Sequence, residues 1–327
     1  MQYLILIIVA LYAYFVHVQA QDVSMRPEIL AQVSSGQLER FPAFPSKYVN
    51  SRPVLVWTPP GYEAAVQQGK KYSVLYMHDG ENLFDKSVTW NKQEWTIDET
   101  ASRLMQEGSV KDFIVVGIFT GRGEENYRHK EYYPEKVYRA LPKEEQERLY
   151  GYESQTLYAD EYLQFLTKEL KPFIDSKYNV HTDAAHTAVM GSSMGGLISM
   201  YAISEYPEIF GAAACVSTHW VGWKPQTDTG IHAAAFMEYM KETLPPAQTH
   251  RIYFDYGDQT LDQYYPKYQK QVDLLLQDLG YDEKNWKTVF APGTAHDETS
   301  WAARVDQPLG FLFGKDTKAK EESPQEK

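Results

Sequence analysis

A serine flanked by glycines lies where one pattern of apolar residues gives way to another. An apolar run typical of a buried strand ends at Met190, and a helix-like segment begins a few residues later. Between them, Gly191, Ser193 and Gly195 form the pattern Gly-x-Ser-x-Gly, which raises a serine hydroxyl on a sharp strand-to-helix turn that leaves no room for flanking Cβ atoms. Ser192 does not fit, because the residues two positions away are methionines. Although so short a pattern also occurs by chance, its position predicts Ser193 as a nucleophile.

A serine hydroxyl needs a base to accept its proton and an acid to hold that base. In the α/β-hydrolase fold, where this pattern occurs, the chain order is serine, acid, histidine. The histidines that follow Ser193 are His219, His232, His250 and His296. His296 lies in a turn directly after the last predicted strand, whereas His219 comes too early and the other two follow no strand end. We therefore predict His296 as the general base.

The acid is expected after the preceding predicted strand, which ends at Tyr256. Three aspartates compete there, namely Asp255, Asp258 and Asp262. Asp255 falls within the strand and Asp258 in the tight turn after it. Asp262 opens the next helix, where capping the helix is an alternative role. Chain order alone does not separate the three.

Acyl transfer also requires two backbone N–H groups that stabilise the negative oxygen of the tetrahedral intermediate. The residue after the nucleophile, Met194, is expected to supply one of them. The other is expected from the loop after the strand that ends at His78, where Gly80 allows the backbone to turn and Glu81 follows. A glycine turn that caps a helix is the alternative interpretation of this loop.

The elements that must position these residues alternate along the chain between strands and helices. Helical spacing of apolar residues links Tyr162 to Leu170 and ends at Pro172, and similar spacing links Tyr268 to Leu279. This alternation predicts an α/β fold with a mostly parallel sheet and helices on both faces. The predicted strands are Val54–Thr58, Val74–His78, Phe113–Phe119, Thr187–Met190, Ala212–Ser217, Arg251–Tyr256 and Lys287–Phe290.

Three segments fall outside this pattern. Residues 1–20 are apolar and uncharged and end in Val18-Gln19-Ala20, which predicts a signal peptide and a secreted or periplasmic protein; a membrane anchor is the alternative. Residues 127–158 predict a cap or long loop within a catalytic domain that spans residues 21–314. Residues 315–327 predict a disordered tail.

The composition excludes some classes of partner. A net charge of −12 argues against nucleic acid and anionic membranes. Cys215 is the single cysteine, so no intramolecular disulfide can form. His181 and His186 match no metal-ligand spacing known to us, so we expect neither a metal nor an organic cofactor.

The sequence also indicates residues that could contact a substrate. Trp220 and Trp301 lie in or near loops expected beside Ser193, where indole rings could stack on a sugar or an aromatic acyl group, although packing explains most such residues. Arg122 and Arg128 follow the third predicted strand and could bind a carboxylate or phenolate.

Taken together, four motifs from Arg52 to His296 resemble the "putative esterase" group of α/β hydrolases, with similarity from about Ser46 to Gly314. That group includes feruloyl, acetylxylan and enterochelin-type esterases, S-formylglutathione hydrolases and mycolyltransferases. The motifs are Arg52-Pro53-Val54-x-Val56-Trp57-Thr58-Pro59-Pro60-Gly61-Tyr62, Tyr76-Met77-His78-Asp79-Gly80-Glu81-Asn82-Leu83-Phe84-Asp85, Gly191-Ser192-Ser193-Met194-Gly195-Gly196 and Pro292-Gly293-x-x-His296.

The resemblance implies that the acid lies in the unit Thr260-Leu261-Asp262, so Asp262 is chosen and Asp258 ranks second. It implies a serine carboxylic-ester hydrolase acting on small esters or on acyl, acetyl or feruloyl esters of carbohydrate. A siderophore trilactone esterase is the alternative. A relative that binds carbohydrate or protein without catalysis is the alternative from another class.

Overall fold

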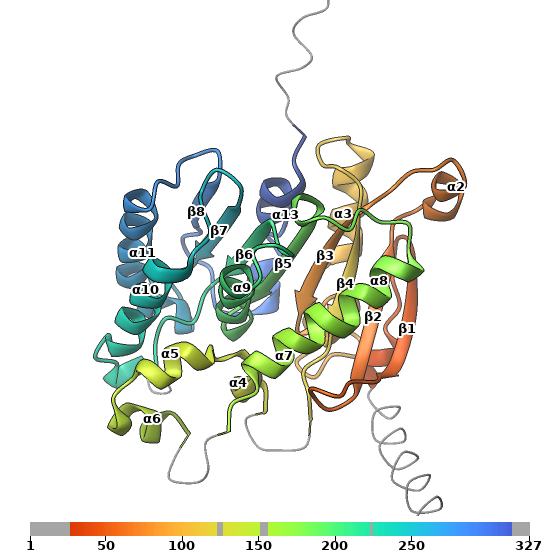
Figure 1. Ribbon diagram of the computed structural model, residues 1–327. Coiled ribbons are helices and arrows are strands. Elements are labelled where there is room, and N and C mark those ends of the chain that lie inside the picture. The colour runs from red at the N-terminus through yellow and green to blue at the C-terminus, as the bar shows by residue number, and fades with distance from the viewer. Residues whose placement is uncertain (1–26, 123–126, 151–155, 223–224, 316–327) are drawn as a thin grey trace, which may run out of the picture.

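The computed structural model describes residues 27–122, 127–150, 156–222 and 225–315. An eight-stranded sheet in the order β1-β2-β4-β3-β5-β6-β7-β8 runs through its centre (Figure 1). β2 is antiparallel to β1 and β4, and every pair from β4 to β8 is parallel. The strands are β1 (Gln37–Phe44), β2 (Arg52–Thr58), β3 (Ser73–His78), β4 (Phe113–Ile118), β5 (Thr187–Ser192), β6 (Ala212–Val216), β7 (Arg251–Tyr256) and β8 (Trp286–Phe290).

The central strands are buried on both faces, as their continuous apolar runs predict. Within β3, Val74 and Tyr76 belong to one hydrophobic core, and Leu75 and Met77 belong to the core on the opposite face. Both cores are closed by helices, so the protein has the three layers expected of an α/β fold.

Helices cover both faces of the sheet (Figure 1). The first core packs against α7 to α11, and the second packs against α3 and α13. The helices are α2 (Tyr62–Gln67), α3 (Ile97–Gln106), α4 (Tyr127–Tyr132), α5 (Glu135–Ala140), α6 (Lys143–Tyr150), α7 (Ala159–Phe165), α8 (Lys171–Lys177), α9 (Met194–Glu205), α10 (Ile231–Thr243), α11 (Pro266–Asp278), α12 (Glu298–Ala302) and α13 (Asp306–Phe313). Short turns of other helix types are η1 (Pro27–Leu30), η2 (Gly80–Asn82), η3 (Leu166–Leu170), η4 (Ala184–His186), η5 (Pro225–Thr227) and η6 (Thr260–Tyr264).

The sequence predicts a helix that ends at Pro172, but in the structure the helix continues to Lys177. Before the proline, η3 is a π-helical turn, and Pro172 occupies the first turn of α8. A proline has no backbone N–H to donate, and its ring crowds the carbonyl of the preceding turn. It is tolerated here because the wider π-helical turn needs no hydrogen bond from that position and leaves room for the ring.

The described part of the segment 127–158 contains α4, α5 and α6. The predicted signal peptide and residues 316–327 of the predicted tail lie outside the described residues. Within the described ranges, no helix is both long and apolar enough to span a bilayer.

Candidate active site

Ser193 lies on a sharp turn between β5 and α9. Its backbone has a φ of 59° and a ψ of −120°, which is unusual for a residue other than glycine. A Cβ atom added to Gly191 would lie 2.8 Å from the carbonyl oxygen of Gly195, so this close approach needs glycine. The Ser193 N–H donates to the carbonyl of Val216 at the end of β6, which ties the turn to the neighbouring strand.

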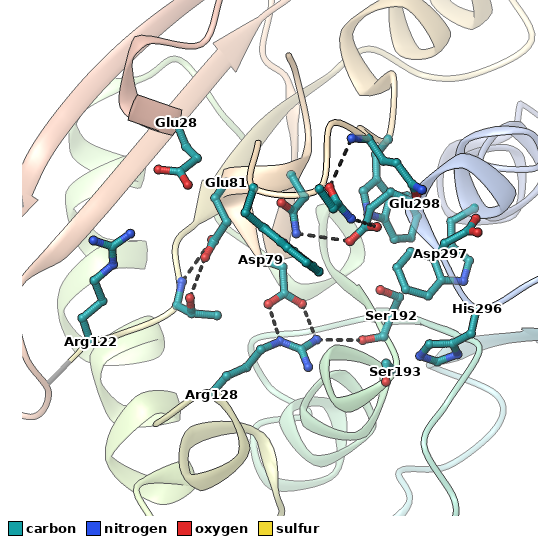
Figure 2. A pocket seen from close by; sticks show the side chains of 17 residues that line it. Glu28, Asp79, Glu81, Arg122, Arg128, Ser192, Ser193, His296, Asp297 and Glu298 are labelled. Atoms are coloured by element: carbon teal, nitrogen blue, oxygen red, sulfur yellow. Dashed lines mark hydrogen bonds and ion pairs between the residues drawn. The ribbon is translucent and has the colours of Figure 1, made fainter. Parts of the chain in front are cut away.

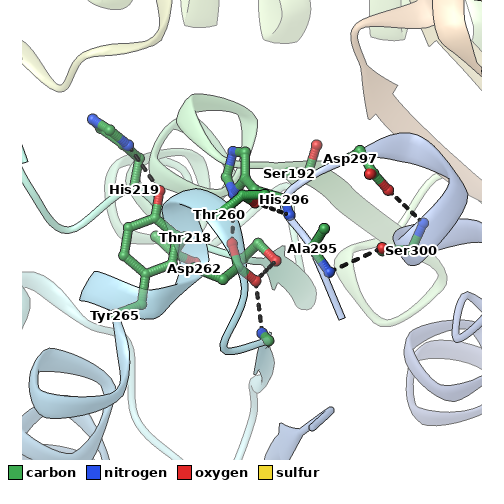
Figure 3. Close-up of polar contacts among 12 residues, drawn as sticks. Ser192, Thr218, His219, Thr260, Asp262, Tyr265, Ala295, His296, Asp297 and Ser300 are labelled. Atoms are coloured by element: carbon green, nitrogen blue, oxygen red, sulfur yellow. Dashed lines mark hydrogen bonds and ion pairs between the residues drawn. The ribbon is translucent and has the colours of Figure 1, made fainter. Parts of the chain in front are cut away.

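His296 and Asp262 come together at the carboxyl ends of the next strands. His296 lies in the loop after β8, and Asp262 lies in η6 after β7. The His296 Nδ1 atom is 2.6 Å from Asp262 Oδ1 (Figure 3). The His296 backbone N–H also donates to the Thr260 hydroxyl at 2.8 Å, so η6 holds both the ring and the backbone of the histidine.

The second oxygen of Asp262 is also held. Asp262 Oδ2 accepts hydrogen bonds from the Ser217 hydroxyl at 2.7 Å and from the Gly257 N–H at 2.6 Å. Burial works to raise the pKa of Asp262, but the hydrogen bonds and the charge of His296 outweigh it and hold that pKa below its ordinary value. The carboxylate is therefore kept charged beside the imidazole.

The two other candidate acids have different partners. Asp258 accepts hydrogen bonds from the Gly293 N–H and the Gln259 side chain, both at 2.8 Å, as a turn residue does. Asp255 is buried in β7 and forms an ion pair with Arg304 at 2.9 Å. The structure thus brings Asp262 to His296 and engages the other two aspartates elsewhere.

Ser193 and His296 line the same cavity, whose volume is about 750 Å³ (Figure 2). Ser193 is 8% exposed and the His296 side chain 12%, so both reach the cavity while most of each is buried. The remaining lining residues are Glu28, Asp79, Glu81, Asn82, Trp90, Asn91, Gln93, Trp95, Thr120, Arg122, Arg128, Ser192, Asp297, Glu298 and Trp301.

The side chains of the other histidines downstream of Ser193 have partners other than Asp262. His219 Nδ1 lies 2.9 Å from Tyr265 Oη, and His232 Nδ1 lies 2.8 Å from Tyr133 Oη. The two ring nitrogens of His250 lie 2.8 Å from the Pro207 carbonyl and from Thr249 Oγ1.

One predicted N–H donor directly follows Ser193, and the other lies in the short turn after β3. Met194 is the first residue of α9, and Glu81 is the central residue of η2. The Glu81 carboxylate accepts from the Thr120 N–H and hydroxyl at 3.1 and 2.5 Å, which turns that side chain toward β4.

The predicted arginines both line the cavity, with different degrees of engagement. The Arg128 guanidinium makes two hydrogen bonds to Asp79, at 2.6 and 2.7 Å, and lies over the ring of Tyr132. Arg122 is exposed, and its side chain is drawn on the same side of the cavity as Arg128 (Figure 2).

The predicted tryptophans differ in position. Trp301 lines the cavity, its ring packs edge-to-face on His296 with centroids 5.1 Å apart, and its Nε1–H donates to Ser217. The prediction for Trp220 is wrong, because its ring is fully buried beneath α10 and α11 and its Nε1–H donates to Gln269. So large an apolar ring gains more from burial than from a place at the cavity wall.

Among the described residues, one group of three side chains has metal-ligand types close together. His181, Asp183 and His186 have ligand atoms within 4.8 Å of one another, before β5. The two imidazole rings stack nearly parallel, 4.0 Å apart at 18°, and His186 Nδ1 contacts Asp183.

The mostly parallel sheet and the turn at Ser193, with an aspartate and a histidine after later strands, define the class of α/β hydrolases. Residues 46–306 match the family described as "Putative esterase". The chain belongs to this family and is a carboxylic ester hydrolase.

Individual relatives are distant in sequence. "Uncharacterized protein YbbA" of Bacillus subtilis (strain 168) is 24% identical over 271 residues, which cover 81% of this chain and 94% of that protein. A ferulic acid esterase structure is 20% identical, with a TM-score of 0.60, and the match covers 85% of this chain and 98% of that one. The enterobactin esterase FES from Shigella flexneri is 18% identical, with a TM-score of 0.60, and the match covers 88% of this chain and 62% of that one.

Proposed function

We propose that this chain is a secreted serine esterase in which Ser193 is the nucleophile, His296 the general base and Asp262 the acid that orients His296. The observation that carries the proposal is the 2.6 Å contact between Asp262 Oδ1 and Nδ1 of His296, a residue that lines the same cavity as Ser193. Because Nδ1 is engaged by the carboxylate, Nε2 is left to accept the serine proton.

The reaction follows from these positions in two stages. Ser193 Oγ bonds to the acyl carbon as its proton passes to His296, and the carbonyl oxygen becomes negatively charged. The N–H groups of Met194 and Glu81 are the proposed donors to that oxygen. His296 then gives the proton to the leaving alcohol, and water releases the acyl group by the same steps.

Export is the part of the proposal that depends on the N-terminal sequence. The run from Tyr3 to Val16 is almost wholly apolar, and no charged side chain precedes Asp22. These features support a signal peptide over residues 1–20 and a secreted or periplasmic enzyme.

For the substrate, we propose an acyl, acetyl or feruloyl ester of carbohydrate. Trp90 lines the cavity and is 75% exposed, so its face is available to stack on a sugar or aromatic ring. Asn91 and Gln93 line the cavity beside it and carry amide groups suited to sugar hydroxyls. An exposed indole ring and amide groups in the cavity support a sugar ester as the substrate.

A siderophore trilactone is the second candidate, and one observation favours it. Arg122 and Arg128 lie on one side of the cavity, across from Glu298 (Figure 2). A guanidinium on that side could bind a phenolate oxygen through a charge-assisted hydrogen bond. Turnover of methyl ferulate, acetylated xylan and a catecholate trilactone, compared on one preparation, distinguishes the candidates.

The serine chemistry is tested by Ser193→Ala, with Ser176→Ala as the matched control because Ser176 is exposed on α8. We expect Ser193→Ala to lower kcat on p-nitrophenyl acetate by roughly 10³-fold or more. A fluorophosphonate probe should label the wild type and the control but not Ser193→Ala. Wild-type activity in Ser193→Ala would refute the proposal, and a wild type that neither reacts nor turns over would favour a non-catalytic binding protein.

A further inference from the structure

The guanidinium of Arg128, in α4, contacts two segments that are far apart in the sequence (Figure 2). Its Nε and Nη2 atoms donate to the two carboxylate oxygens of Asp79, at 2.6 and 2.7 Å. The same Nη2 atom donates to the Ser192 carbonyl at 3.4 Å. Asp79 directly precedes η2, which carries Glu81, and Ser192 directly precedes the nucleophile. One planar group therefore joins the loop after β3 to the end of β5.

Asp79 has a backbone conformation that needs support from its neighbours. Its φ of 55° and ψ of 46° lie in the left-handed region, which is uncommon for a residue other than glycine. Its N–H donates to the hydroxyl of Tyr132 at 3.3 Å, and Tyr132 is a fully buried residue of the same helix as Arg128. The helix α4 thus holds Asp79 by its backbone as well as by its carboxylate.

The Asp79 carboxylate also lies against the nucleophile turn. A Cβ atom added to Gly195 would lie 3.3 Å from Asp79 Oδ2, so the carboxylate packs on the first turn of α9, which begins at Met194. On its other side, Asp79 is followed by Gly80, where an added Cβ would lie 2.5 Å from the backbone of β4. The position of the Glu81 N–H therefore depends on where Asp79 is held relative to α9 and β4.

We propose that Arg128 is a positioning residue for the oxyanion site, an inference that rests on the serine chemistry proposed above. Through Asp79 and the Ser192 carbonyl, it sets the spacing between the two backbone N–H donors of that site. A guanidinium that binds a carboxylate at two points fixes an angle as well as a distance, which suits it to holding two backbone segments in one geometry. The donors bind the charged oxygen of the intermediate more strongly than the carbonyl of the substrate, so the effect falls on the transition state. Arg128 transfers no proton.

Arg128→Ala tests the inference on p-nitrophenyl acetate, which has no anionic group for an arginine to bind. We expect kcat to fall by about 10²-fold while KM changes by less than about threefold, because misplaced donors weaken binding of the oxyanion and not of the uncharged ester. The Ki of a trifluoromethyl ketone, whose adduct with the serine presents a negative oxygen to the same donors, should rise by the factor by which kcat/KM falls. The matched control is Arg103→Ala, which removes an exposed ion pair of α3 and should leave all three constants unchanged. A rise in KM alone, or a fall in kcat with an unchanged Ki, would overturn the inference.

A double-mutant cycle with Asp79→Ala separates positioning from a direct contact of Arg128 with the substrate. If the two side chains act as one unit, Asp79→Ala should lower kcat as Arg128→Ala does, and the double variant should fall no more than about threefold below either single variant. Guanidinium chloride, added below denaturing concentrations, should raise kcat of Arg128→Ala but not of the double variant, because the cation needs the Asp79 carboxylate; sodium chloride at the same concentration should not. A double variant whose loss equals the product of the two single losses would overturn the inference.

Arg128→Lys takes the place of Arg128→Ala if the alanine variant does not fold. Lysine keeps the charge but cannot make the two-point contact with Asp79, so we expect kcat to fall by about tenfold or more. Full activity in Arg128→Lys, with Asp79→Ala also fully active, would overturn the inference. Loss of activity in Ser193→Ala together with full activity in Arg128→Ala would overturn it too, and would leave the serine esterase intact.

Discussion

At the scale of single residues, Asp262 shows how a buried carboxylate is kept charged. Its side chain is fully buried, which opposes ionisation, yet hydrogen bonds from His296, Ser217 and Gly257 hold its pKa below the ordinary value. The Ser217 hydroxyl can donate to Asp262 because it accepts from Trp301 and Arg304. Trp301 and Arg304 therefore act on the imidazole through Ser217 and Asp262.

Asp262→Asn is expected to lower kcat by up to about 10⁴-fold, because an amide that donates to Nδ1 selects the wrong tautomer of His296. Asp258→Asn is the matched control, and we expect a small effect because Asp258 contacts Gly293 and Gln259. Steady-state kinetics on a p-nitrophenyl ester measures both variants. A larger loss from Asp258→Asn would mean that the acid has been misassigned.

The same variant has a second readout in the pH dependence of stability. Because the pKa of Asp262 is lower in the folded state, its ionisation stabilises the fold above its ordinary pKa, and this stabilisation is lost as the pH falls through the folded-state pKa. Between about pH 4 and pH 2 the wild type should therefore lose more stability than Asp262→Asn. Denaturation midpoints measured across that range would show the difference.

The site residues that the sequence predicts differ from those that it does not mark in the signal that each leaves in the sequence. Ser193 lies in a motif and His296 follows a strand, so pattern and order were enough to predict both. The choice between Asp258 and Asp262 needed a family resemblance, because both follow the same strand. Ser217 has no marker at all, since it gains its position only when the end of β6 and η6 lie side by side.

At the scale of elements, the loop after β3 depends on close contact between two backbones. A Cβ atom added to Gly80 would lie 2.5 Å from the carbonyl carbon of Gly117 in β4. The turn η2 is therefore seated directly on the strand, and this seating fixes the position of Glu81. A side chain at Gly80 would push the whole turn away from β4.

Gly80→Ala is expected to lower kcat by at least about tenfold, because a displaced η2 no longer aims the proposed Glu81 N–H at the developing oxyanion. Gly310→Ala in α13 is the matched control, since an added Cβ there has no atom within 4 Å and alanine favours a helix. Kinetics and thermal melts of both variants test this. Full activity in Gly80→Ala would show that Glu81 is not the donor.

Elements were predicted best where burial on both faces leaves a continuous apolar run. The seven predicted strands all occur, with ends shifted by two residues or fewer. The one strand of the sheet that was not predicted is β1. It lies at the sheet edge, contains Pro42 and has an irregular register between Phe41 and Phe44. Its mixture of exposed and half-buried residues lacks the pattern that marks the others.

At the scale of the whole molecule, a buried ion pair links segment 127–158 to the sheet. Arg52 in β2 and Glu131 in α4 are 1% and 0% exposed and approach to 2.5 Å, with a second hydrogen bond at 2.8 Å. Glu131 also accepts from the Gly121 N–H, after β4. Because α4 carries Arg128 into the cavity, the same helix joins the stability of the molecule to the shape of its candidate site.

Glu131→Gln leaves the Arg52 charge buried without an anionic partner, so the free energy of unfolding should fall by about 3 kcal/mol or more. Glu63→Gln, on the exposed face of α2, is the matched control and should change it by less than about 0.5 kcal/mol. Urea unfolding followed by both circular dichroism and tryptophan fluorescence measures the change. Arg52→Met combined with Glu131→Leu removes both charges and should recover most of the loss, because apolar side chains of similar size need no partner. If Glu131→Gln lowered the free energy no more than the control, α4 would be held by its apolar contacts alone, and the ion pair would not couple this segment to the sheet.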